Sequence, residues 1–555
     1  MSRTTVTTVI VFTLAFAFIT PSTHAQCTST QLAAPFAGDA FANDQFGRSV
    51  AVHERLAVVG APEDDFGVGS AYVYEFDDGE WQQVAKLTAS DAIAGYKFGI
   101  SVGVSGDVIV VGAYQPFPAE QPGKAYVFER PAGGWANMNE TATLTASDGA
   151  NNDNFGFAVD IDGTTIVIGA YLDDDGGPNS GAAFVFEQPV GGWTTMTETG
   201  KLTSGDLDEN DQFGRSVAIA GDTIAVGADY DSNVAYQAGA AYVFVKPAGG
   251  WTTAVDNGKL TAAVPVDFDR CGLSVGVGDG FVIAGAWGDD QVAQKTGAVL
   301  VFVRPDTGWS DLTTTAKLVA SDAVSGDHLG WSVEADGQVI AAGAPANLFD
   351  GSGFGATYLF LQPITGWADA TEDAKLVSSN LTEDDEFGTA VALSGPMVNV
   401  GARFFATGGY MNAGAAYLFG GALDCNDNQE IDICEIVSGS SPDDDGNGML
   451  DECETSSAVP ETSRQMTLLQ NRPNPFNPST EIRYTVSSAG DGALQVFDLQ
   501  GKLVRTLQQG RFAAGNGSVV WNGRDDHGQQ VSSGVYVYRL SVGGHTQNHR
   551  MVMLK

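Results

Sequence analysis

The stretch from Phe46 to Ala61, FGRSVAVHERLAVVGA, contains the pattern that decides the fold. A Phe-Gly pair opens it, an alternating segment and a short turn follow, and a continuous apolar run ends in Gly-Ala. Both segments are short, rich in Val and bounded by Gly or polar residues, which is typical of β-strands. The second segment is apolar throughout, as expected of a strand that is buried on both faces.

This pattern recurs every 52 to 58 residues. The pairs are Phe46-Gly47, Phe98-Gly99, Phe155-Gly156, Phe213-Gly214 and Phe387-Gly388, with degenerate copies at Cys271-Gly272 and Leu329-Gly330. After Gly-Ala, each unit continues with an acidic loop and a Gly-x-Ala-Tyr-Val-Tyr/Phe segment, and most add a Gly-Trp turn and a Lys-Leu strand. Four strands per unit and seven units predict an all-β fold, a seven-bladed β-propeller over residues 26–423.

The two ends of the array predict a closed ring. The last unit stops at Phe419, without a Lys-Leu strand after it. Gln31-Leu32 precedes the first Phe-Gly pair without a unit of its own. We therefore expect the N-terminal segment to complete the last blade, which would remove the exposed edge of an open array.

These motifs resemble the FG-GAP repeat family, found in integrin α-subunit heads and in many secreted bacterial proteins. The resemblance implies the propeller fold and says little about function. Several integrin blades carry a calcium loop between their first two strands, but here that turn is as short as His53-Glu54-Arg55, so the loop is not carried over. Carboxylates cluster instead after Gly-Ala and before Phe-Gly, as in Asp173-Asp174-Asp175 and at Asp206, Asp208 and Asp211. Both cation sites and solvated turns fit such clusters.

The charge and the N-terminus indicate where the protein acts. The chain has 68 acidic and 27 basic residues and a net charge of -41, which argues against nucleic-acid binding. Residues 1–25 have the basic start, apolar run and small-residue cleavage site of a signal peptide. No later run is long enough to span a membrane. We expect a mature chain without a transmembrane segment, secreted or at the outer cell surface.

Residues 424–454 form a separate acidic segment with two calcium-type loops in register. Oxygen side chains stand at loop positions 1, 3, 5, 9 and 12, and position 7 would offer its backbone carbonyl. The expected ligands are Asp424, Asn426, Asn428, Glu430, Asp432, Glu435, Asp443, Asp445, Asn447, Met449, Asp451 and Glu454. The segment resembles dockerin-like and thrombospondin type-3-like repeats, although Gln429 stands where Gly is usual. Calcium is the expected cofactor here, and in the propeller loops it stays an open possibility.

The C-terminal part reads as a linker, residues 455–465, and a small β domain, residues 466–555. Expected strands include Glu481 to Val486 and Val535 to Leu540, with residues 551–555 as an edge strand. The motif Asn474-Pro475-Phe476-Asn477-Pro478 and the terminal hydrophobic-Lys ending resemble the type A sorting domain of type IX secretion. That family is related to the Ig-like domain of flagellar hook-cap proteins. The resemblance implies an Ig-like β-sandwich that engages the secretion machinery.

No motif in the sequence predicts an enzyme. Two Gly-x-Ser-x-Gly matches occupy the ordinary strand after Phe-Gly and lack the strand–turn–helix of a nucleophile elbow. We expect a secreted or cell-surface binding or adhesion protein with an extracellular protein or glycan ligand. Its expected ligand face carries aromatic residues that follow Gly-Ala at equivalent positions, namely Tyr114, Tyr171, Tyr230 and Trp287. Two alternatives stay open: a calcium-assisted polysaccharide lyase or hydrolase, and a structural envelope component.

Overall fold

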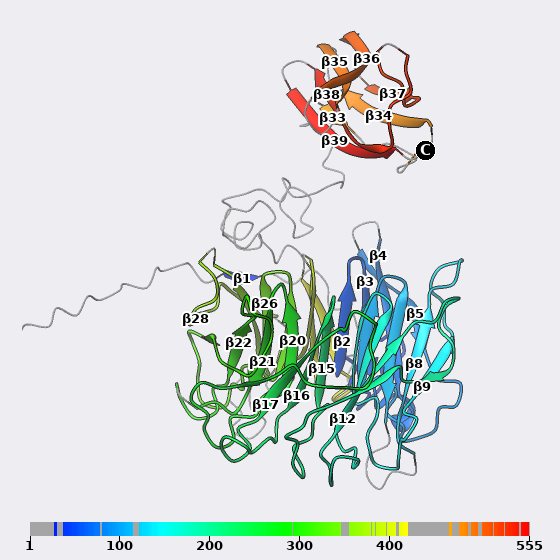
Figure 1. The fold of residues 1–555 in the computed structure, drawn as a ribbon. Coiled ribbons are helices and arrows are strands. Elements are labelled where there is room, and N and C mark those ends of the chain that lie inside the picture. The colour runs from blue at the N-terminus through cyan, green and yellow to red at the C-terminus, as the bar shows by residue number, and fades with distance from the viewer. Residues whose placement is uncertain are drawn as a thin grey trace, which may run out of the picture. The chain divides into compact units, whose positions relative to one another are not determined.

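The computed structural model describes residues 27–29, 37–419 and 466–553, apart from short interruptions within the last two ranges. The chain divides into two compact units, residues 1–454 and 455–555. Both units consist of β-sheets, and the single helix among the described residues is the four-residue α1 (Asp64–Gly67). Figure 1 shows the strands of each unit.

The first unit is a β-propeller built of small antiparallel sheets, each beginning just after a Phe-Gly pair or its degenerate copy. We number these sheets one to seven in chain order. Their first, innermost strands are β2 (Ser49–His53), β6 (Ser101–Ser105), β10 (Ala158–Asp162), β15 (Ser216–Ala220), β20 (Cys271–Gly278), β25 (Ser332–Asp336) and β30 (Phe387–Ser394). Each innermost strand contacts that of the next sheet, and β30 contacts β2, so the ring is closed.

The second and third strands carry the apolar repeats. The second strands are β3 (Leu56–Ala61), β7 (Val108–Ala113), β11 (Thr165–Ala170), β16 (Thr223–Ala228), β21 (Phe281–Ala286), β26 (Val339–Ala344) and β31 (Met397–Ala402). The third strands are β4 (Ser70–Asp77), β8 (Lys124–Glu129), β12 (Ala182–Glu187), β17 (Ala240–Val245), β22 (Ala298–Val303), β27 (Ala356–Leu361) and β32 (Ala415–Phe419). The second strands are buried along nearly their whole length, as their sequence predicts.

The fourth strands are the Lys-Leu segments, and short strands join one sheet to the next. The fourth strands are β5 (Glu80–Leu87), β9 (Ala142–Thr145), β14 (Gly200–Thr203), β19 (Gly258–Thr261), β24 (Ala316–Val319) and β29 (Ala374–Leu376). The joining strands, which the sequence did not predict, are β1 (Cys27–Ser29), β13 (Met196–Thr197), β18 (Ala254–Val255), β23 (Leu312–Thr313) and β28 (Ala370–Thr371). Each pairs in parallel with the fourth strand of the preceding sheet.

The N-terminal strand β1 indicates how the ring closes. It pairs with β29 of sheet six, in the place that β28 takes on sheet five. Elsewhere such a joining strand directly precedes the fourth strand of the following sheet, as β13 precedes β14. The strand expected at Gln31-Leu32 lies outside the described residues.

An apolar cluster fills each interface between adjacent sheets. Between sheets seven and one, Phe46 and Val50 pack with Ala416 and Leu418. The Phe of each intact pair packs at a steep angle against aromatic side chains of its own third strand, as Phe46 does edge-to-face against Tyr72 with ring centroids 5.5 Å apart. Gly47 adopts a φ of +87°, and a Cβ there would lie 2.1 Å from the carbonyl oxygen of Ala415. A side chain at this position would therefore wedge sheets one and seven apart.

The second unit contains two sheets around one core. One sheet has the order β33 (Met466–Leu468), β34 (Thr480–Val486), β37 (Gly515–Trp521), and the other β36 (Leu503–Phe512), β35 (Gly490–Phe497), β38 (Gly534–Val542), β39 (His545–Met553). The last strand lies at a sheet edge, as predicted. Phe476 of the Asn-Pro-Phe-Asn-Pro motif is buried against Trp521, with ring centroids 5.5 Å apart.

Candidate binding face

Two kinds of propeller loop end on one face, and the connections between third and fourth strands lie on the other. Neighbouring strands are antiparallel, so the loop from the second to the third strand and the loop into the next sheet meet on the same side. In sheet one, Ser49 pairs with Gly60 and Ala61 pairs with Ser70 at this end. We call this side the loop face. Hairpin turns between the first and second strands lie on the opposite side.

Arginines from several sheets gather on the loop face near the propeller axis. Arg48 and Arg215 directly follow Phe-Gly pairs, and Arg403 directly follows Gly401-Ala402. Arg48 in sheet one interacts electrostatically with Arg215 in sheet four and Arg403 in sheet seven. Sheets one and four are not neighbours in the ring, so both side chains must point toward the axis. We call Arg48, Arg215 and Arg403 the arginine centre.

Aromatic rings line the arginine centre. The ring centroids of Tyr114 and Phe157 lie 5.5 Å apart, and those of Phe157 and Tyr171 lie 4.7 Å apart. The Cζ atom of Arg215 lies 4.5 Å from the Phe157 centroid and 4.7 Å from that of Tyr171. These are cation–π distances, which partly compensate a guanidinium for the water it has lost.

Two more groups extend the cluster. In the first, Cζ of Arg270 lies 3.6 Å from the centroid of Tyr230, and its Nη1 lies 3.6 Å from Oδ2 of the buried Asp229. In the second, Trp287 packs against His328 and Trp331, with centroids 4.9 and 5.6 Å away. Rings and guanidinium groups therefore both lie at this end of the axis.

The charges of the arginine centre are only partly neutralised. Arg403 forms an ion pair with Glu386. Arg48 and Arg215 have no carboxylate within ion-pair distance among the described residues. Burial raises the pKa of Asp229, and the positive charges of Arg215 and Arg270 oppose this shift. Burial, and then the positive charges of Arg403 and Arg215, lower the pKa of Arg48 to about 10. The centre thus holds positive charge at an energetic cost.

The structure places all four sequence-predicted ligand residues on the loop face, each half-buried. Tyr114 and Tyr171 meet through Phe157, whereas Tyr230 and Trp287 belong to the two other groups. The predicted equivalence of Tyr230 is wrong. Asp173 and Asp231 hold the same place in their sheets, each bound to a lysine of the fourth strand, so Tyr230 lies one residue later than Tyr171. Asp229 takes the place of the aromatic residue in sheet four.

Sequence reasoning missed the arginines. Alignment of the seven repeats on the residue after Phe-Gly could have found two of them, because Arg48 and Arg215 share that repeat position. In chain order this position holds Arg48, Ile100, Phe157, Arg215, Leu273, Trp331 and Thr389. Cations and large rings at one repeat position indicate a functional centre better than any single motif does.

Exposed apolar side chains also concentrate on the loop face. Thirteen of the fifteen large exposed hydrophobic residues described in the propeller lie in its two kinds of loop, and only Val190 and Val255 lie elsewhere. The thirteen are Phe41, Phe66, Ile93, Val234, Tyr236, Val264, Val266, Phe268, Val292, Val324, Phe354, Tyr410 and Met411. Some form exposed pairs, such as Tyr236 with Phe268, whose centroids lie 5.3 Å apart.

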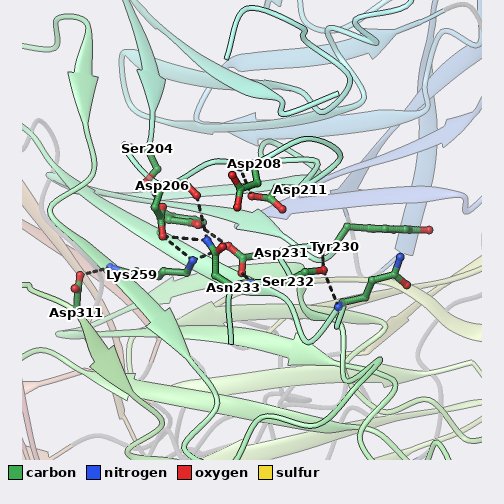
Figure 2. A network of polar contacts seen from close by, with 12 residues as sticks. Ser204, Asp206, Asp208, Asp211, Tyr230, Asp231, Ser232, Asn233, Lys259 and Asp311 are labelled. Atoms are coloured by element: carbon green, nitrogen blue, oxygen red, sulfur yellow. Dashed lines mark hydrogen bonds and ion pairs between the residues drawn. The ribbon is translucent and has the colours of Figure 1, made fainter. Parts of the chain in front are cut away.

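The carboxylates of the acidic loops contact lysine side chains, which the sequence did not indicate. Figure 2 shows Lys259 of β19 between two carboxylates, with Nζ 2.7 Å from Asp206 Oδ2 and 2.6 Å from Asp231 Oδ2. Tyr242 also donates its hydroxyl to Asp231 at 2.8 Å. Fourth-strand lysines at the equivalent place in other sheets, with their carboxylates, are Lys86 with Asp39 and Asp64, Lys201 with Asp148, Asp173 and Asp175, Lys317 with Asp289, and Lys375 with Asp322. In sheet two Thr143 takes this place, and Lys124 of the third strand pairs with Asp91 instead. We call this set the outer lysine network. A built-in ammonium thus lies beside these carboxylates, and calcium in the propeller loops stays a prediction.

Another set of aspartates closes the turns before Phe-Gly. Asp211 accepts a hydrogen bond from the backbone N–H of Asp208 at 2.7 Å, and Asp44 accepts one from Phe41 at 2.5 Å. Burial raises the pKa of Asp44, Asp153, Asp211 and Asp269 to about 6. Their role is structural, because each carboxylate satisfies a backbone donor of its own loop.

Two further carboxylates lie deeper along the axis. Asp160 of β10 accepts hydrogen bonds from the N–H groups of Ile219 and Ile161, at 2.7 and 2.8 Å. Burial raises its pKa to about 7. Burial and the nearby Asp160 raise the pKa of Glu334 of β25 well above its ordinary value. Sheets three and six are far apart in the ring, so both side chains point toward the axis.

The expected calcium ligands, from Asp424 to Glu454, all lie outside the described residues. Cys271, the one cysteine whose side chain the structure describes, is buried and free in place of a Phe of the repeat. In the described part of the chain, no helix is long and apolar enough to cross a membrane.

Comparison with known proteins supports the two-part organisation. A family model described as the FlgD Ig-like domain matches residues 478–546. A search of curated proteins found no match. Among solved structures, a hypothetical selenium-binding protein from Sulfolobus tokodaii matches with 11% identity and a TM-score of 0.39, covering 61% of this chain and 81% of that one. FlgD from P. aeruginosa matches with 20% identity and a TM-score of 0.12, covering 16% of this chain and 65% of that one. Neither structural likeness is close enough to inform function.

The repeat region has the most extensive match. A family model described as the FG-GAP repeat matches residues 30–74, 81–128, 138–186, 196–244, 312–360 and 370–419. The unmatched interval contains sheet five, whose repeat begins with Cys271-Gly272 instead of Phe-Gly. The six matched segments cover just over half of the chain and account for the other sheets of the propeller. The chain therefore belongs to the FG-GAP repeat family.

Proposed function

We propose that this protein is an exported binding protein whose loop face recognises a macromolecular partner outside the cell. One observation carries the proposal: thirteen of fifteen large exposed apolar residues of the propeller lie in the loops of this one face. Clustered apolar surface is unusual on a monomeric protein and marks interaction sites. Recognition is proposed here rather than catalysis.

The composition of the loop face fits contact with another protein. Interfaces are enriched in aromatic residues, Met and Arg, and the residues that dominate binding energy are most often Trp, Tyr and Arg. The loop face has apolar loops such as those of Phe268 and Met411 outside, with Trp287 and Arg48 nearer the axis. The antiparallel sheets give these loops a rigid support, which limits the entropy lost on binding.

The same proposal includes a propeller of seven blades. Seven sheets follow one another in a closed ring of contacts, and β1 approaches the place where Gln31-Leu32 would supply the fourth strand of sheet seven. Such closure leaves no unpaired edge strand. It would hold the loops of all seven sheets at fixed distances around the arginine centre.

The remaining parts are assigned to export and attachment. We propose that residues 1–25 direct secretion and that residues 466–555 form an Ig-like sandwich read by the type IX machinery as a sorting domain. The two sheets around Phe476 and Trp521 support this assignment. Residues 424–454 would bind calcium and stiffen the connection between the two units.

A binding screen of the full mature chain tests the proposed function. Immobilised matrix proteins and polysaccharides would be probed with calcium and then with chelator. We expect specific binding to a matrix protein that falls at least tenfold in Tyr236→Ser and Phe268→Ser. The control Val190→Ser, which removes an even more exposed apolar side chain away from the loop face, should bind like the wild type. Equal binding by all three variants would overturn the loop face as the recognition surface.

A further inference from the structure

The structure assigns a ligand chemistry to the loop face: we infer that the arginine centre binds a carboxylate presented by the protein partner, with Arg48 and Arg215 as its charged contacts. This inference rests on the proposed function and adds the chemical group that is recognised. The chain's net charge of -41 would not suggest an anionic ligand. The local arrangement of arginines on the loop face does suggest an anionic ligand.

The cations of the arginine centre are treated differently from others in the propeller. The lysines of the outer lysine network each contact at least one carboxylate, and Lys201 contacts three. The Arg48 side chain, by contrast, forms no hydrogen bond or ion pair among the described residues, and the Arg215 side chain lies over the rings of Phe157 and Tyr171, with the buried Asp229 as a charge beyond ion-pair distance. In a chain with more than twice as many acidic as basic residues, unpaired guanidinium groups near the axis are unexpected.

The geometry suits an oxyanion. Arg48, Arg215 and Arg403 come from sheets one, four and seven and approach the axis from different directions. Guanidinium groups offer planar forks of N–H donors that match a carboxylate. Their mutual repulsion disfavours the empty state, as the depressed pKa of Arg48 indicates. An anion between them would relieve that repulsion in surroundings where water screens poorly.

The surroundings favour a protein as the source of the carboxylate. Beyond the arginine centre, the loops expose Val, Ile, Phe and Met side chains, including Val292, Phe354 and Met411. Aliphatic side chains of this kind match the apolar residues of a protein surface. An acidic polysaccharide would bring carboxylates or sulfates, but a hydrated chain would leave these residues without partners.

The topology disfavours the chain's own acidic segment as the occupant. Strand β32 begins on the loop face, where Ala415 pairs with Ala402, and it ends on the opposite side, where Phe419 pairs with Val398. The chain therefore leaves the propeller on the side away from the arginine centre.

Selection of peptides on the full mature chain tests the inference. Displayed random twelve-residue peptides would be selected on the wild type and then synthesised, each with its acidic residues and with these changed to the amides. We expect selected peptides to carry Asp or Glu beside apolar residues. The amide versions should bind at least tenfold more weakly. Arg48→Gln and Arg215→Gln should each reduce binding of the acidic peptides at least tenfold.

Matched variants separate this inference from the proposed function. Arg304→Gln removes an exposed arginine that follows the third strand of sheet five, on the opposite side, and should bind within twofold of the wild type. Phe268→Ser should weaken both peptide versions. If Phe268→Ser abolishes binding while the Arg48 and Arg215 variants and the amide peptides bind normally, the recognition surface stands and the carboxylate site is refuted.

Polysaccharide probes decide the class of partner. Alginate and chondroitin sulfate would be titrated against the wild type and against Arg48→Gln. We expect weak binding of both, at least a hundredfold weaker than the best peptide. Tight, Arg48-dependent binding of either polysaccharide without any Arg48-dependent peptide would overturn the assignment to a protein. Far-ultraviolet circular dichroism and melting temperature would show that each variant is folded.

Discussion

The outer lysine network and the arginine centre arise from the same loops of the same repeat, yet they treat positive charge in opposite ways. Lys259 is held by Asp206 and Asp231, whereas Arg215 faces Phe157 and Tyr171. In the network the charges are mutually neutralised, and the loops are tied to the sheets. In the centre the charge remains available. The comparison teaches that the neighbouring residue decides the role of a cation in this scaffold: a carboxylate makes it structural, and an aromatic ring leaves it able to bind a ligand.

The largest expected effect comes from breaking the network. Lys259→Met leaves the fully buried Asp231 without its ammonium, so the free energy of unfolding should fall by about 3–5 kcal/mol. Denaturant unfolding followed by tryptophan fluorescence would measure the change. Lys246→Met in the same sheet removes a cation from the partly exposed pair with Glu187 and should cost less than about 1 kcal/mol. Similar losses of unfolding free energy in the two variants would show that burial does not strengthen the ion pairs of the network.

A second prediction sharpens the role of the built-in ammonium. Lys201 lies among Asp148, Asp173 and Asp175, whose ligand atoms lie within 4.8 Å of one another. Lys201→Met should therefore lose about 3 kcal/mol in chelator and recover about 1–2 kcal/mol in millimolar calcium, because the metal replaces the ammonium. Lys259→Met, with two carboxylates at its site, is the control and should recover less. Absence of a differential calcium effect would contradict this interpretation.

The aspartates that close the turns set a pH dependence opposite to that of the network. Asp44, Asp153, Asp211 and Asp269 have a pKa of about 6 in the folded chain and an ordinary value of 3.8. The folded chain thus binds more protons between these values. Its free energy of unfolding should rise by about 1–3 kcal/mol as the pH falls from 7 to 4.5.

Below that range the trend should reverse. The pKa values of network carboxylates such as Asp206 and Asp322 are lowered, since their hydrogen bonds with lysine outweigh burial, which alone would raise them. Their contribution is present above pH 3.8 and is lost as the pH falls further. Melting temperatures from pH 3 to 8 would test both trends. Asp211→Asn keeps the loop's acceptor and should flatten the rise, so an unchanged profile would argue against these groups.

The smallest expected effect is a gain. Arg48→Met removes a positive charge that has no ion-pair partner among the described residues, so the free energy of unfolding should increase by about 1 kcal/mol. Arg270→Met should decrease it, because Asp229 is buried and would lose a cation. Denaturant unfolding of both variants would measure these changes. A loss of stability in Arg48→Met would indicate that Arg48 serves the fold instead of a ligand.

The sequence predicted much of the fold because a propeller repeats its chemistry locally. Each Phe-Gly pair marks the start of a sheet, each Gly-Ala ends a second strand, and each Lys-Leu segment forms the fourth. Short, uniform units of this kind depend on neighbours close in sequence, so their spacing suffices to find them. The joining strands were missed because two paired residues leave no periodic pattern.

The candidate site could be predicted only in part. The aromatic residues near Gly-Ala reach the predicted face, although Asp229 and not Tyr230 holds the place of Tyr171 in sheet four. The acidic loops suggested metal ions, since a sequence shows the carboxylates but not the lysine that arrives about 28 residues later from the fourth strand. Pairing across strands decides which charges are already neutralised.

By itself, the sequence determined that this chain forms an all-β propeller of FG-GAP repeats followed by a second β unit, because strand pattern and spacing are local properties. Only the tertiary structure decided that Arg48, Arg215 and Arg403 would meet. These residues stand in three repeats, up to 355 positions apart in the chain. Closure of the ring brings sheets one and seven together, and the positions after Phe-Gly and after Gly-Ala carry these arginines to a common axis. A cationic centre in a strongly acidic protein is thus a product of ring geometry, which no local stretch of sequence contains.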